Sequence, residues 1–455
     1  MTPVTLEQIR RAVDGRMNGP SPAIQIETIG TDTRRMSGGG LFIAIVGEKL
    51  DGHDYLQQAK GRGAVAAIVN ERDRECPDGL HCVHVPDTRK AMGKLAQWVR
   101  RQFGGKVIAV AGSNGKTGTK RLIDAALKTT LRGTISPKSF NNDIGVPLSI
   151  FAAGENDDYL VVEIGTNHHG EIAVLTEIAR PDIAVITNCS AEHLEGLSDL
   201  DGVRRENASI VAGMPGDGLL IVNGDDAELL EAIEGWRGEC VTFGFSEEND
   251  LWAADVGCDA SGTRFRLNGK QEVFVPLLGR HTAVNALTAI AVGRRLCVAD
   301  ERIIAGLSEA TGPEMRLELK MLGGVNLLND AYNANPASMR AALETLCALP
   351  ASGRRVAVLG EMRELGIWSD RFHRELGATA ARCRLDKLVC VGGSAALIGE
   401  AARAAGMNGE LVSFHGDATA AASAVAGYVR SGDLVLLKGS RAIGLEKVAE
   451  KIGKP

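Results

Sequence analysis

The sequence predicts an α/β protein of three domains built on parallel sheets, and two observations lead to this prediction. The first is its length, since 455 residues correspond to about three domains of roughly 150 residues each. The second is a repeated pattern in which continuous apolar runs of strand length alternate with segments of helix length. Parallel sheets covered by helices on both faces have this pattern. We expect the domains to span residues 1–104, 105–312 and 313–455.

The first domain is expected to mix helices with short strands. Apolar runs of strand length lie at residues 40–46 and 64–69. An amphipathic helix is expected over residues 88–103, followed by Gly104 and Gly105. Glycines in this position suit a boundary between domains, so we expect an N-terminal α/β domain that ends at Gly104.

The second domain is expected to be a parallel sheet with an antiparallel addition. Continuous apolar runs at residues 159–163, 183–187 and 218–222 are separated by segments of helix length. Over residues 240–278 the pattern changes to alternation of apolar and polar residues with turn signals such as Asn268-Gly. This change predicts an antiparallel flap attached to the parallel core.

The third domain begins near Pro313 and is expected to be a second doubly wound, Rossmann-like α/β unit. Its apolar runs at residues 356–359, 388–391 and 433–437 again alternate with segments of helix length. That order of elements is typical of an open parallel sheet with helices on both faces.

The composition argues against several classes of protein. With a net charge of −6 and only 4% aromatic residues, the chain is not expected to bind nucleic acid. The nine cysteines are scattered singly, without a Cys-x-x-Cys pair. This spacing predicts neither a disulfide framework nor a zinc site, and it favours a reducing compartment.

The start of the chain has the features of a helix in a soluble protein. Thr5 and Gln8 have the spacing of a capping box, and the segment lacks the apolar core of a signal peptide. No apolar run approaches the roughly 18 residues that a membrane-spanning helix needs. We therefore expect a cytoplasmic protein without membrane insertion. We also expect a monomer, although no sequence feature specifies the oligomeric state.

The most informative segment is a glycine-rich loop that follows the apolar run at residues 107–111. Glycines in such a loop let backbone N–H groups turn toward phosphate oxygens at the N-terminus of a helix. Lys116 would reach the outer phosphates of a nucleotide triphosphate, and the Thr117 hydroxyl would bind its magnesium ion. The residues expected around the phosphates are Gly112, Ser113, Asn114, Gly115, Lys116, Thr117 and Gly118.

The loop departs from the strict eight-residue pattern. That pattern has its first glycine at position 110, where this chain has Val110. We therefore interpret the loop as a compact variant. The alternative is a glycine-rich turn with an incidental lysine, which the helix-prone segment 118–131 disfavours.

Two further polar residues follow apolar strands. Glu163 ends the run at residues 159–163, at the edge where open α/β sheets bind ligands, and it could bind the magnesium ion. The alternative is a glutamate satisfied by backbone N–H groups. His193 follows the run at residues 183–187, and because imidazole is an unusual partner for magnesium its position alone does not decide its role.

Taken in order along the whole chain, these residues resemble the Mur ligases, the ATP-dependent amide ligases that build the stem peptide of peptidoglycan. The compact phosphate loop matches that family, as does the segment Asn141–Pro147. The resemblance implies the three-domain Mur ligase architecture. Its parts are an N-terminal UDP-muramoyl substrate domain, a central ATP-binding domain and a C-terminal Rossmann-like ligase domain.

The resemblance also implies roles for individual residues. The motifs Asp32-Thr-Arg34 and Asp51-Gly-His53 look like the part of the family that holds the UDP-muramoyl substrate. Residues 279–281 resemble the adenine-side motif, and an inter-domain arginine would reach the nucleotide. The implied substrate contacts are Asp32, Thr33, Arg34, Asp51, His53, Asn141, Asn142, Asn333 and Asn335. Beyond the phosphate loop, the implied nucleotide contacts are His281, Asn285, Arg316 and Asp330. The implied catalytic residues are Lys116, Glu163 and His193, and the magnesium ligands are Thr117, Glu163 and His193.

Within the family, the segment Leu328–Pro336 discriminates best between members. Its Tyr-Asn-Ala-Asn-Pro motif, followed by Ser338 and Met339, is typical of the enzyme that joins D-alanyl-D-alanine to UDP-N-acetylmuramoyl-tripeptide. The relative that forms the tripeptide carries an Asn-Pro-Arg motif, which this sequence lacks. The resemblance thus implies ATP and Mg²⁺ as cofactors and an acyl phosphate as intermediate.

Two positions depart from the family pattern. Thr282 stands where the adenine-side motif usually has an asparagine, although Asn285 is present. Asn207 stands where the family usually has a lysine that is carbamylated and binds a second magnesium ion. An amide oxygen is neutral, so the second magnesium would be held more weakly, through Asn207 and water, or by Glu206 after a local shift.

Two alternatives follow from the same residues. One is another amide ligase of the superfamily, either the tripeptide-forming Mur ligase or a folylpolyglutamate-type enzyme. The other is a catalytically impaired nucleotide-binding homologue, which only Asn207 favours. Phosphate release from ATP in the presence of both substrates separates these possibilities.

Overall fold

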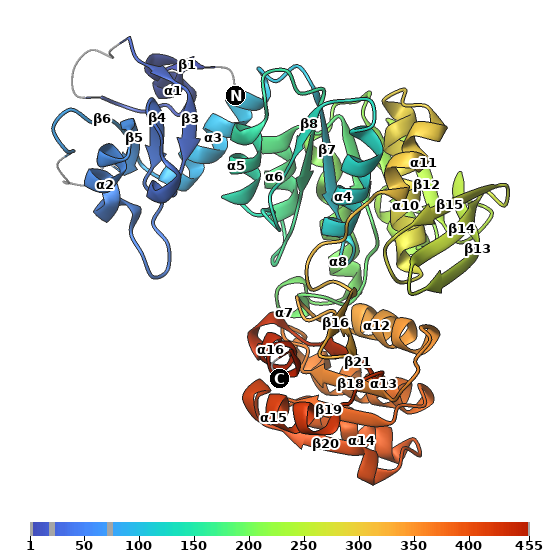
Figure 1. Ribbon diagram of the computed structural model, residues 1–455. Coiled ribbons are helices and arrows are strands. Elements are labelled where there is room, and N and C mark those ends of the chain that lie inside the picture. The colour runs from blue at the N-terminus through green and yellow to red at the C-terminus, as the bar shows by residue number, and fades with distance from the viewer. Residues whose placement is uncertain (1–2, 18–22, 71–75, 454–455) are drawn as a thin grey trace.

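The computed structural model describes residues 3–17, 23–70 and 76–453, and it confirms the α/β class with parallel sheets (Figure 1). Each of the three expected parts of the chain contains its own sheet with a parallel core. Within the described residues, no helix is long and apolar enough to cross a membrane.

The N-terminal part is a four-stranded parallel sheet in the order β3-β4-β5-β6, beside a short antiparallel pair β1-β2. Its strands are β1 (Val4–Thr5), β2 (Gln25–Ile26), β3 (Thr28–Gly30), β4 (Gly40–Ile43), β5 (Ala64–Asn70) and β6 (His81–Val85). Its helices are α1 (Leu6–Ala12), η1 (Thr33–Arg35), η2 (Gly52–Tyr55), α2 (Leu56–Gly61) and α3 (Thr88–Arg100). The capping box expected from Thr5 and Gln8 is present at the start of α1.

Helix α3 connects this part to the central sheet rather than standing apart from it. Asp87 caps its N-terminus by accepting from the backbone N–H groups of Arg89 and Lys90. At its other end the Arg100 guanidinium donates to the backbone oxygen of Ala179 at 2.9 Å. Buried side chains of α3 belong to the same apolar cluster as residues of the central domain. The apolar core therefore runs from the first part into the second without a break.

The cysteines differ from the expectation in one place. Cys76 and Cys82 form a disulfide across a sequence separation of 6 residues. The other seven cysteines are free. The absence of a Cys-x-x-Cys motif gave no sign of this pair. The two cysteines are brought together by the turn that leads into β6.

The central part is a nine-stranded sheet in the order β15-β14-β13-β12-β11-β10-β7-β9-β8. Its strands are β7 (Lys106–Ala111), β8 (Gly133–Ile135), β9 (Tyr159–Glu163), β10 (Ile183–Ile186), β11 (Leu219–Asn223), β12 (Glu239–Gly244), β13 (Leu251–Asp259), β14 (Gly262–Leu267) and β15 (Gln271–Val275). Its helices are α4 (Lys116–Leu127), α5 (Gly145–Ala152), α6 (Glu171–Ala179), α7 (Leu194–Leu197), α8 (Leu200–Ala208), η3 (Ser209–Gly213), α9 (Ala227–Ala232), α10 (His281–Arg295) and α11 (Asp300–Ser308).

The expected antiparallel flap is present, but it begins later than the sequence pattern indicated. Strand β12 still pairs in parallel with β11, and only β13, β14 and β15 pair antiparallel with one another. The three antiparallel strands extend the central sheet on the side of α10 and α11 (Figure 1).

Strand β7 explains why the phosphate loop lacks its first glycine. Val107, Ala109 and Ala111 pack into the apolar cluster on one face of the sheet, while Ile108 and Val110 pack into the cluster on the other. Val110 is fully buried against the side of α4 and α10. A strand covered on both faces is continuous through position 110, so the loop starts only at the strand's end.

The C-terminal part is a six-stranded sheet in the order β16-β17-β21-β18-β19-β20, parallel except for β16. Its strands are β16 (Glu318–Leu322), β17 (Val325–Asn329), β18 (Arg355–Gly360), β19 (Lys387–Val391), β20 (Val412–His415) and β21 (Leu434–Lys438). Its helices are α12 (Pro336–Ala348), η4 (Gly366–Trp368), α13 (Ser369–Arg382), α14 (Ala396–Ala404), η5 (Gly409–Leu411), α15 (Ala418–Tyr428), η6 (Arg441–Ile443) and α16 (Glu446–Ile452).

Candidate active site

A cavity of about 2150 Å³ lies between the central and C-terminal parts. The loops that follow β7, β9 and β10 line it from the central sheet, and the loop after β17 lines it from the other side. The carboxyl ends of parallel strands are where open α/β sheets bind ligands. Glu48 and Arg89 of the N-terminal part also reach its wall, so all three parts contribute to one cavity.

The phosphate loop occupies the centre of this cavity, and its glycines are required by its shape. Gly112 and Gly115 have φ of +123° and +84°, in the region that disfavours other residues. A Cβ at Gly112 would lie 2.1 Å from the Thr187 Oγ1, and one at Gly115 would lie 3.0 Å from the Asn285 side chain. The loop therefore has room for backbone only.

The loop after β10 holds the phosphate loop in place. The Ser113 N–H donates to the Asn188 carbonyl at 2.8 Å. The Thr187 hydroxyl and the Asn188 amide both donate to the Asn114 carbonyl, at 2.6 and 2.9 Å. Because the backbone of the loop is fixed from two strands, its N–H groups are oriented before any phosphate arrives.

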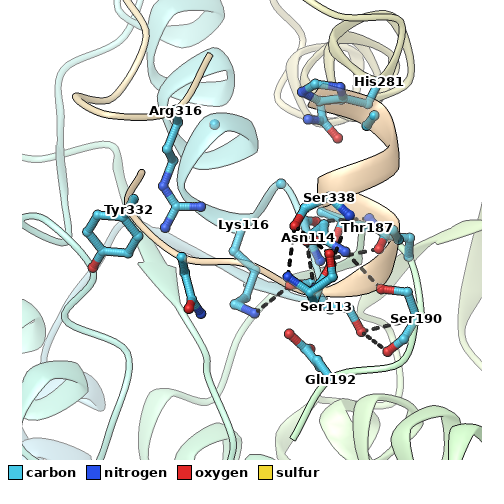
Figure 2. A pocket seen from close by; sticks show the side chains of 18 of the residues that line it. Ser113, Asn114, Lys116, Thr187, Ser190, Glu192, His281, Arg316, Tyr332 and Ser338 are labelled. Carbon is cyan, nitrogen blue, oxygen red and sulfur yellow. Dashed lines mark hydrogen bonds between the residues drawn. The ribbon is translucent and has the colours of Figure 1, made fainter. Parts of the chain in front are cut away.

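Lys116 begins helix α4 and folds back over the loop. Its Nζ donates to the carbonyl of Gly112 and, at 3.3 Å, to that of Ser113. It lines the cavity together with Arg316, whose guanidinium stacks 4.3 Å from the Tyr332 ring centroid. Figure 2 shows both cations facing the cavity, which gives it a positively charged centre beside a helix N-terminus.

Glu163 at the end of β9 is only 1% exposed, and its partners are side chains rather than backbone N–H groups. The Thr117 hydroxyl donates to it at 2.9 Å and the Asn141 amide at 3.1 Å. The Lys120 ammonium also donates to it, at 3.3 Å. The expected pair of Thr117 and Glu163 is therefore in contact.

Lys120 is a residue that the sequence analysis missed. It is 1% exposed and, besides Glu163, donates to the carbonyl and hydroxyl of Ser136 at 2.8 and 3.1 Å. Burial lowers the pKa of the Lys120 ammonium, and the carboxylate of Glu163 opposes that shift. The signal was available, because a lysine three residues after Thr117 lies on the same face of the helix.

His193 lies where the central and C-terminal parts meet. Its Nδ1 is 2.5 Å from the Glu364 Oε2, and the Glu195 N–H donates to the Glu364 carbonyl at 3.4 Å. Both His193 and Glu364 adopt positive φ, +48° and +65°, which costs a non-glycine residue free energy. We call these contacts between the loop after β10 and the loop after β18 the seam.

Glu192, next to His193, is a second residue that the sequence analysis missed. It is 8% exposed and lines the cavity, and its Oε2 lies 4.0 Å from the His193 Nε2. Burial raises the pKa of the Glu192 carboxyl, while the charges of Lys116 and His193 oppose that shift. No motif pointed to it, because a glutamate in a loop has no characteristic spacing.

Asn207 and Glu206 lie on α8, and neither is among the residues that line the cavity. The Asn207 amide donates to the carbonyl of Val203 within its own helix at 2.9 Å. Glu206 accepts from the N–H groups of Gly170 and Ile172 at 2.7 and 2.8 Å, so it holds the N-terminus of α6. A shift of Glu206 toward the cavity would break both bonds.

The expected nucleotide residues outside the loop all line the cavity. His281 and Asn285 do so from α10, and Thr282 is buried there with its hydroxyl donating to the Leu278 carbonyl at 3.0 Å. Asp330 forms an ion pair with the Lys438 Nζ at 2.6 Å. This pair places a second lysine at the wall of the cavity from the C-terminal part.

The asparagines expected to contact substrate fall into the same cavity. Asn141, Asn142, Asn333 and Asn335 all line it. The Asn335 amide donates to the Asn114 side chain at 2.9 Å, which joins the loop after β17 directly to the phosphate loop.

The expected substrate residues of the N-terminal part lie elsewhere and do not line the cavity. Arg34 pairs with Asp32 at 2.8 Å, and the Thr33 hydroxyl is buried and donates to Gln58 at 2.7 Å. His53 is 6% exposed, with Nδ1 2.6 Å from the Asp51 carboxylate and Nε2 accepting from a backbone N–H at 2.9 Å. In this structure these residues organise the fold of the N-terminal part.

Family models match three segments of the chain. The Mur ligase catalytic domain matches residues 25–99, the Mur ligase middle domain residues 110–293, and the Mur ligase glutamate ligase domain residues 315–441. The three matches follow the chain in the order of its three larger sheets, which have four, nine and six strands.

Curated relatives match the chain along nearly its whole length. The UDP-N-acetylmuramoyl-tripeptide–D-alanyl-D-alanine ligase of Bacillus subtilis is 37% identical and covers 98% of each chain. That of Escherichia coli is 36% identical and covers 86% of each. Among solved structures, MurF from Acinetobacter baumannii has a TM-score of 0.90 at 31% identity and covers all of both chains. MurF from Thermotoga maritima in complex with ADP has a TM-score of 0.82 at 27% identity, covering 94% of this chain and 97% of that one.

Proposed function

Because the chain belongs to the Mur ligase family, we infer that it joins D-alanyl-D-alanine to UDP-N-acetylmuramoyl-tripeptide with ATP, a step in peptidoglycan precursor synthesis. The observation that carries this inference is that relatives with this activity match the chain from end to end. Tyr332, Asn333, Ala334 and Asn335 of the discriminating motif line the same cavity as the phosphate loop, which supports the inference. The compartment we propose is the cytoplasm, where ATP is available.

The phosphate loop is proposed to hold the triphosphate of ATP. Its positive-φ glycines leave space for phosphate oxygens against the backbone, and α4 directs the positive end of its dipole toward them. Lys116 would leave the carbonyls it now contacts and bind the outer phosphates. His281 and Asn285, on α10, are proposed to contact the adenosine side.

The residues beside the loop fit a magnesium ion. Hydroxyl and carboxylate oxygens are the ligands that Mg²⁺ prefers, and the Thr117 hydroxyl and Glu163 carboxylate lie 2.9 Å apart at the loop. We therefore propose that Thr117 and Glu163 hold one magnesium ion and that His193 belongs to a second site. Bound there, magnesium neutralises charge that develops on the phosphate oxygens.

The first step is proposed to activate the tripeptide. An oxygen of its terminal carboxylate attacks the γ-phosphorus, the bond from that phosphorus to the bridging oxygen breaks, and ADP leaves. The role of Lys116 and Arg316 is to stabilise negative charge on the transferring group. Phosphoryl transfer depends mainly on position and electrostatics. The fixed backbone of the loop is therefore proposed to contribute to catalysis by holding the triphosphate in position.

The second step is proposed to form the amide. The amine of D-alanyl-D-alanine attacks the acyl carbon, loses a proton, and phosphate leaves. A smaller cavity of about 160 Å³ lies at the seam, where it shares Glu192 and His193 with the large cavity, and Arg363 and Arg441 are among its other lining residues. Two guanidinium groups suit the free carboxylate of the dipeptide, so we propose that the dipeptide enters there. Closure of the C-terminal part over the loop would then bring its amine to the acyl phosphate.

A phosphate-release assay tests this function. The purified protein is mixed with ATP, Mg²⁺ and UDP-N-acetylmuramoyl-tripeptide carrying either lysine or diaminopimelate, with and without D-alanyl-D-alanine. We expect phosphate release in step with formation of the UDP-muramoyl-pentapeptide, and only when both substrates are present. Release instead with a UDP-muramoyl-dipeptide and a diamino acid, or with a folate and glutamate, would identify another ligase of the superfamily. No release with any pair would indicate the impaired homologue.

A further inference from the structure

The second metal position lacks the anionic ligand that the family resemblance implies. Asn207 is neutral, buried to 1% exposure and engaged with the Val203 carbonyl of its own helix. Glu206 holds the N-terminus of α6 with two hydrogen bonds from Gly170 and Ile172. Neither residue of α8 lines the cavity, so the charge must come from another element.

Glu192 is a buried carboxylate that takes no part in the proposed reaction steps and lies at the wall of the cavity. Glu192 is 8% exposed and lines both the large cavity and the smaller one beside the seam. Figure 2 shows it pointing into the same part of the cavity as Lys116. A buried carboxylate is costly unless a cation compensates it, and Lys116 is the residue expected to move to phosphate.

The neighbouring histidine is oriented as a metal ligand would be. The His193 Nδ1 lies 2.5 Å from the Glu364 carboxylate, which leaves Nε2 on the side of Glu192. Histidines that bind metals commonly donate their other ring N–H to a carboxylate in this way. Glu364 comes from the C-terminal part, so the orientation of the imidazole depends on the seam.

The spacing of the two proposed ligand atoms is compatible with one cation. Two atoms that bind the same Mg²⁺ at roughly 2.1 Å each can be at most about 4.2 Å apart. The Glu192 Oε2 and the His193 Nε2 are 4.0 Å apart. In the described part of the chain no three His, Cys, Asp or Glu side chains form a metal-holding group by themselves, so phosphate oxygens would complete the coordination.

We propose that Glu192 acts with His193 as the anionic ligand of the second magnesium ion, in place of the modified lysine absent at position 207. This inference rests on the proposed function, because the second ion is part of that reaction. Both proposed protein ligands then lie on the loop after β10, and Glu364 is the residue that orients His193. The second ion would then keep an anionic protein ligand, which comes from the loop after β10 and not from position 207 on α8.

Manganese binding tests the proposal without requiring turnover. Mn²⁺ is titrated into the full-length protein with a non-hydrolysable ATP analogue, and bound ions are counted by electron paramagnetic resonance. Wild type should bind two ions. The Glu192→Gln variant should keep one and bind the other at least tenfold more weakly, while Glu231→Gln, which changes an exposed carboxylate on α9, should match wild type. Thermal unfolding checks that each variant is folded. Two unchanged affinities in Glu192→Gln would overturn the proposal.

Two further measurements keep the result decisive if Glu192→Gln does not fold. In crystals of wild type with Mn²⁺ and the analogue, the anomalous peak of the second ion should contact Glu192 and His193. A second ion held away from Glu192 would overturn the proposal. If Glu192→Gln folds, adding Asn207→Lys with bicarbonate should restore the second Mn²⁺. If wild type fails to join D-alanyl-D-alanine to the UDP-muramoyl-tripeptide, that failure counts against the proposed function. The number and affinity of bound Mn²⁺ ions test only the role of Glu192.

Discussion

Glu163 and Glu192 are buried carboxylates at the same edge of the central sheet, yet they are held in opposite ways. Glu163 is surrounded by donors from its own domain, namely Thr117, Lys120 and Asn141. Glu192 lies beside His193, whose partner belongs to the C-terminal part. The first region is therefore complete within one domain, and the second is complete only when two domains meet.

This difference separates two tasks of the active site. A loop that must hold a triphosphate gains from being rigid, because the orientation of its N–H groups then costs nothing during the reaction. A region that must admit a second substrate has to open, and it can be assembled from loops of different domains. The positive φ of His193 and Glu364 is the local strain that such an assembly maintains.

The largest loss of activity is expected from removing Lys116. This lysine belongs to the phosphate loop, which together with Glu163 and its partners forms the rigid region of the active site. In Lys116→Ala the loop keeps its glycines and its bonds to the loop after β10, but the transferring phosphate loses the lysine proposed to bind it. We expect phosphate release to fall by at least about 10²–10³-fold, with thermal unfolding unchanged. Lys128→Ala, at the exposed end of the same helix, is the matched control. Substantial turnover in Lys116→Ala would refute the role given to Lys116.

The second-largest effect is expected from removing Lys120, the buried cation that pairs with Glu163 within the central domain. Lys120→Met removes the buried ammonium and leaves the carboxylate without that charge. Removing one partner of a buried ion pair costs about 3–5 kcal/mol, so the unfolding temperature of the central part should drop clearly. Because a divalent cation would replace the missing charge, Mg²⁺ with ADP should stabilise this variant more than it stabilises wild type. Equal stabilisation of the two proteins would contradict the first metal site.

Much of the rigid region could be predicted from the sequence, because its parts are close along the chain. The apolar run of β7, the glycines and the start of α4 follow one another, so one motif specifies strand, loop and helix. Glu163 was expected from its position at a strand end, and it does meet Thr117. Its partner Lys120 was missed although helical spacing from Thr117 indicates it.

The seam could not be predicted in the same way. His193 and Glu364 are far apart in the sequence, and their contact depends on how two domains pack. Glu192 carries no motif, and its importance appears only once its burial is known. Asp51 and His53 pair with each other within the N-terminal part and do not line this cavity, so their expected role in substrate binding stays a prediction.

A smaller effect is expected from removing the charge of Glu364, which breaks its ion pair with His193 at the seam. Glu364→Gln keeps the shape of the side chain but removes the charge that orients His193. The Glu364 side chain is 59% exposed, so stability should change by less than about 1 kcal/mol. Loss of an orienting carboxylate should still weaken the second Mn²⁺ by about tenfold. Glu375→Gln, which removes an exposed carboxylate paired within α13, should leave Mn²⁺ binding unchanged. An unchanged second ion in Glu364→Gln would show that the seam does not support the metal.

The effect expected to be smallest near neutral pH is protonation of His373, which is hydrogen-bonded to the loop that carries Glu364. His373 is fully buried, its Nε2 accepts from the Met362 N–H at 2.9 Å, and its Nδ1 donates to the Ser369 carbonyl at 2.7 Å. Burial away from water disfavours the charged imidazole and lowers the pKa of His373 below its usual value of 6.5, although the bond to the Ser369 carbonyl and the charges of Glu361 and Asp370 oppose that shift. Well above pH 6.5 the imidazole is neutral in both folded and unfolded chains, and its contribution to stability is complete.

As the pH falls below 6.5, the unfolded chain takes up the proton first, so the stability of the C-terminal part should decrease until the folded pKa is passed. The decrease should amount to about 1.4 kcal/mol for each unit by which the pKa is lowered. Unfolding measured between pH 5 and 8 should show this slope in wild type and a flatter profile in His373→Gln. Met362 lies two residues before Glu364, so the second Mn²⁺ should also weaken over the same pH range in wild type more than in the variant. A metal affinity that follows pH identically in both proteins would separate the seam from the loop that His373 holds.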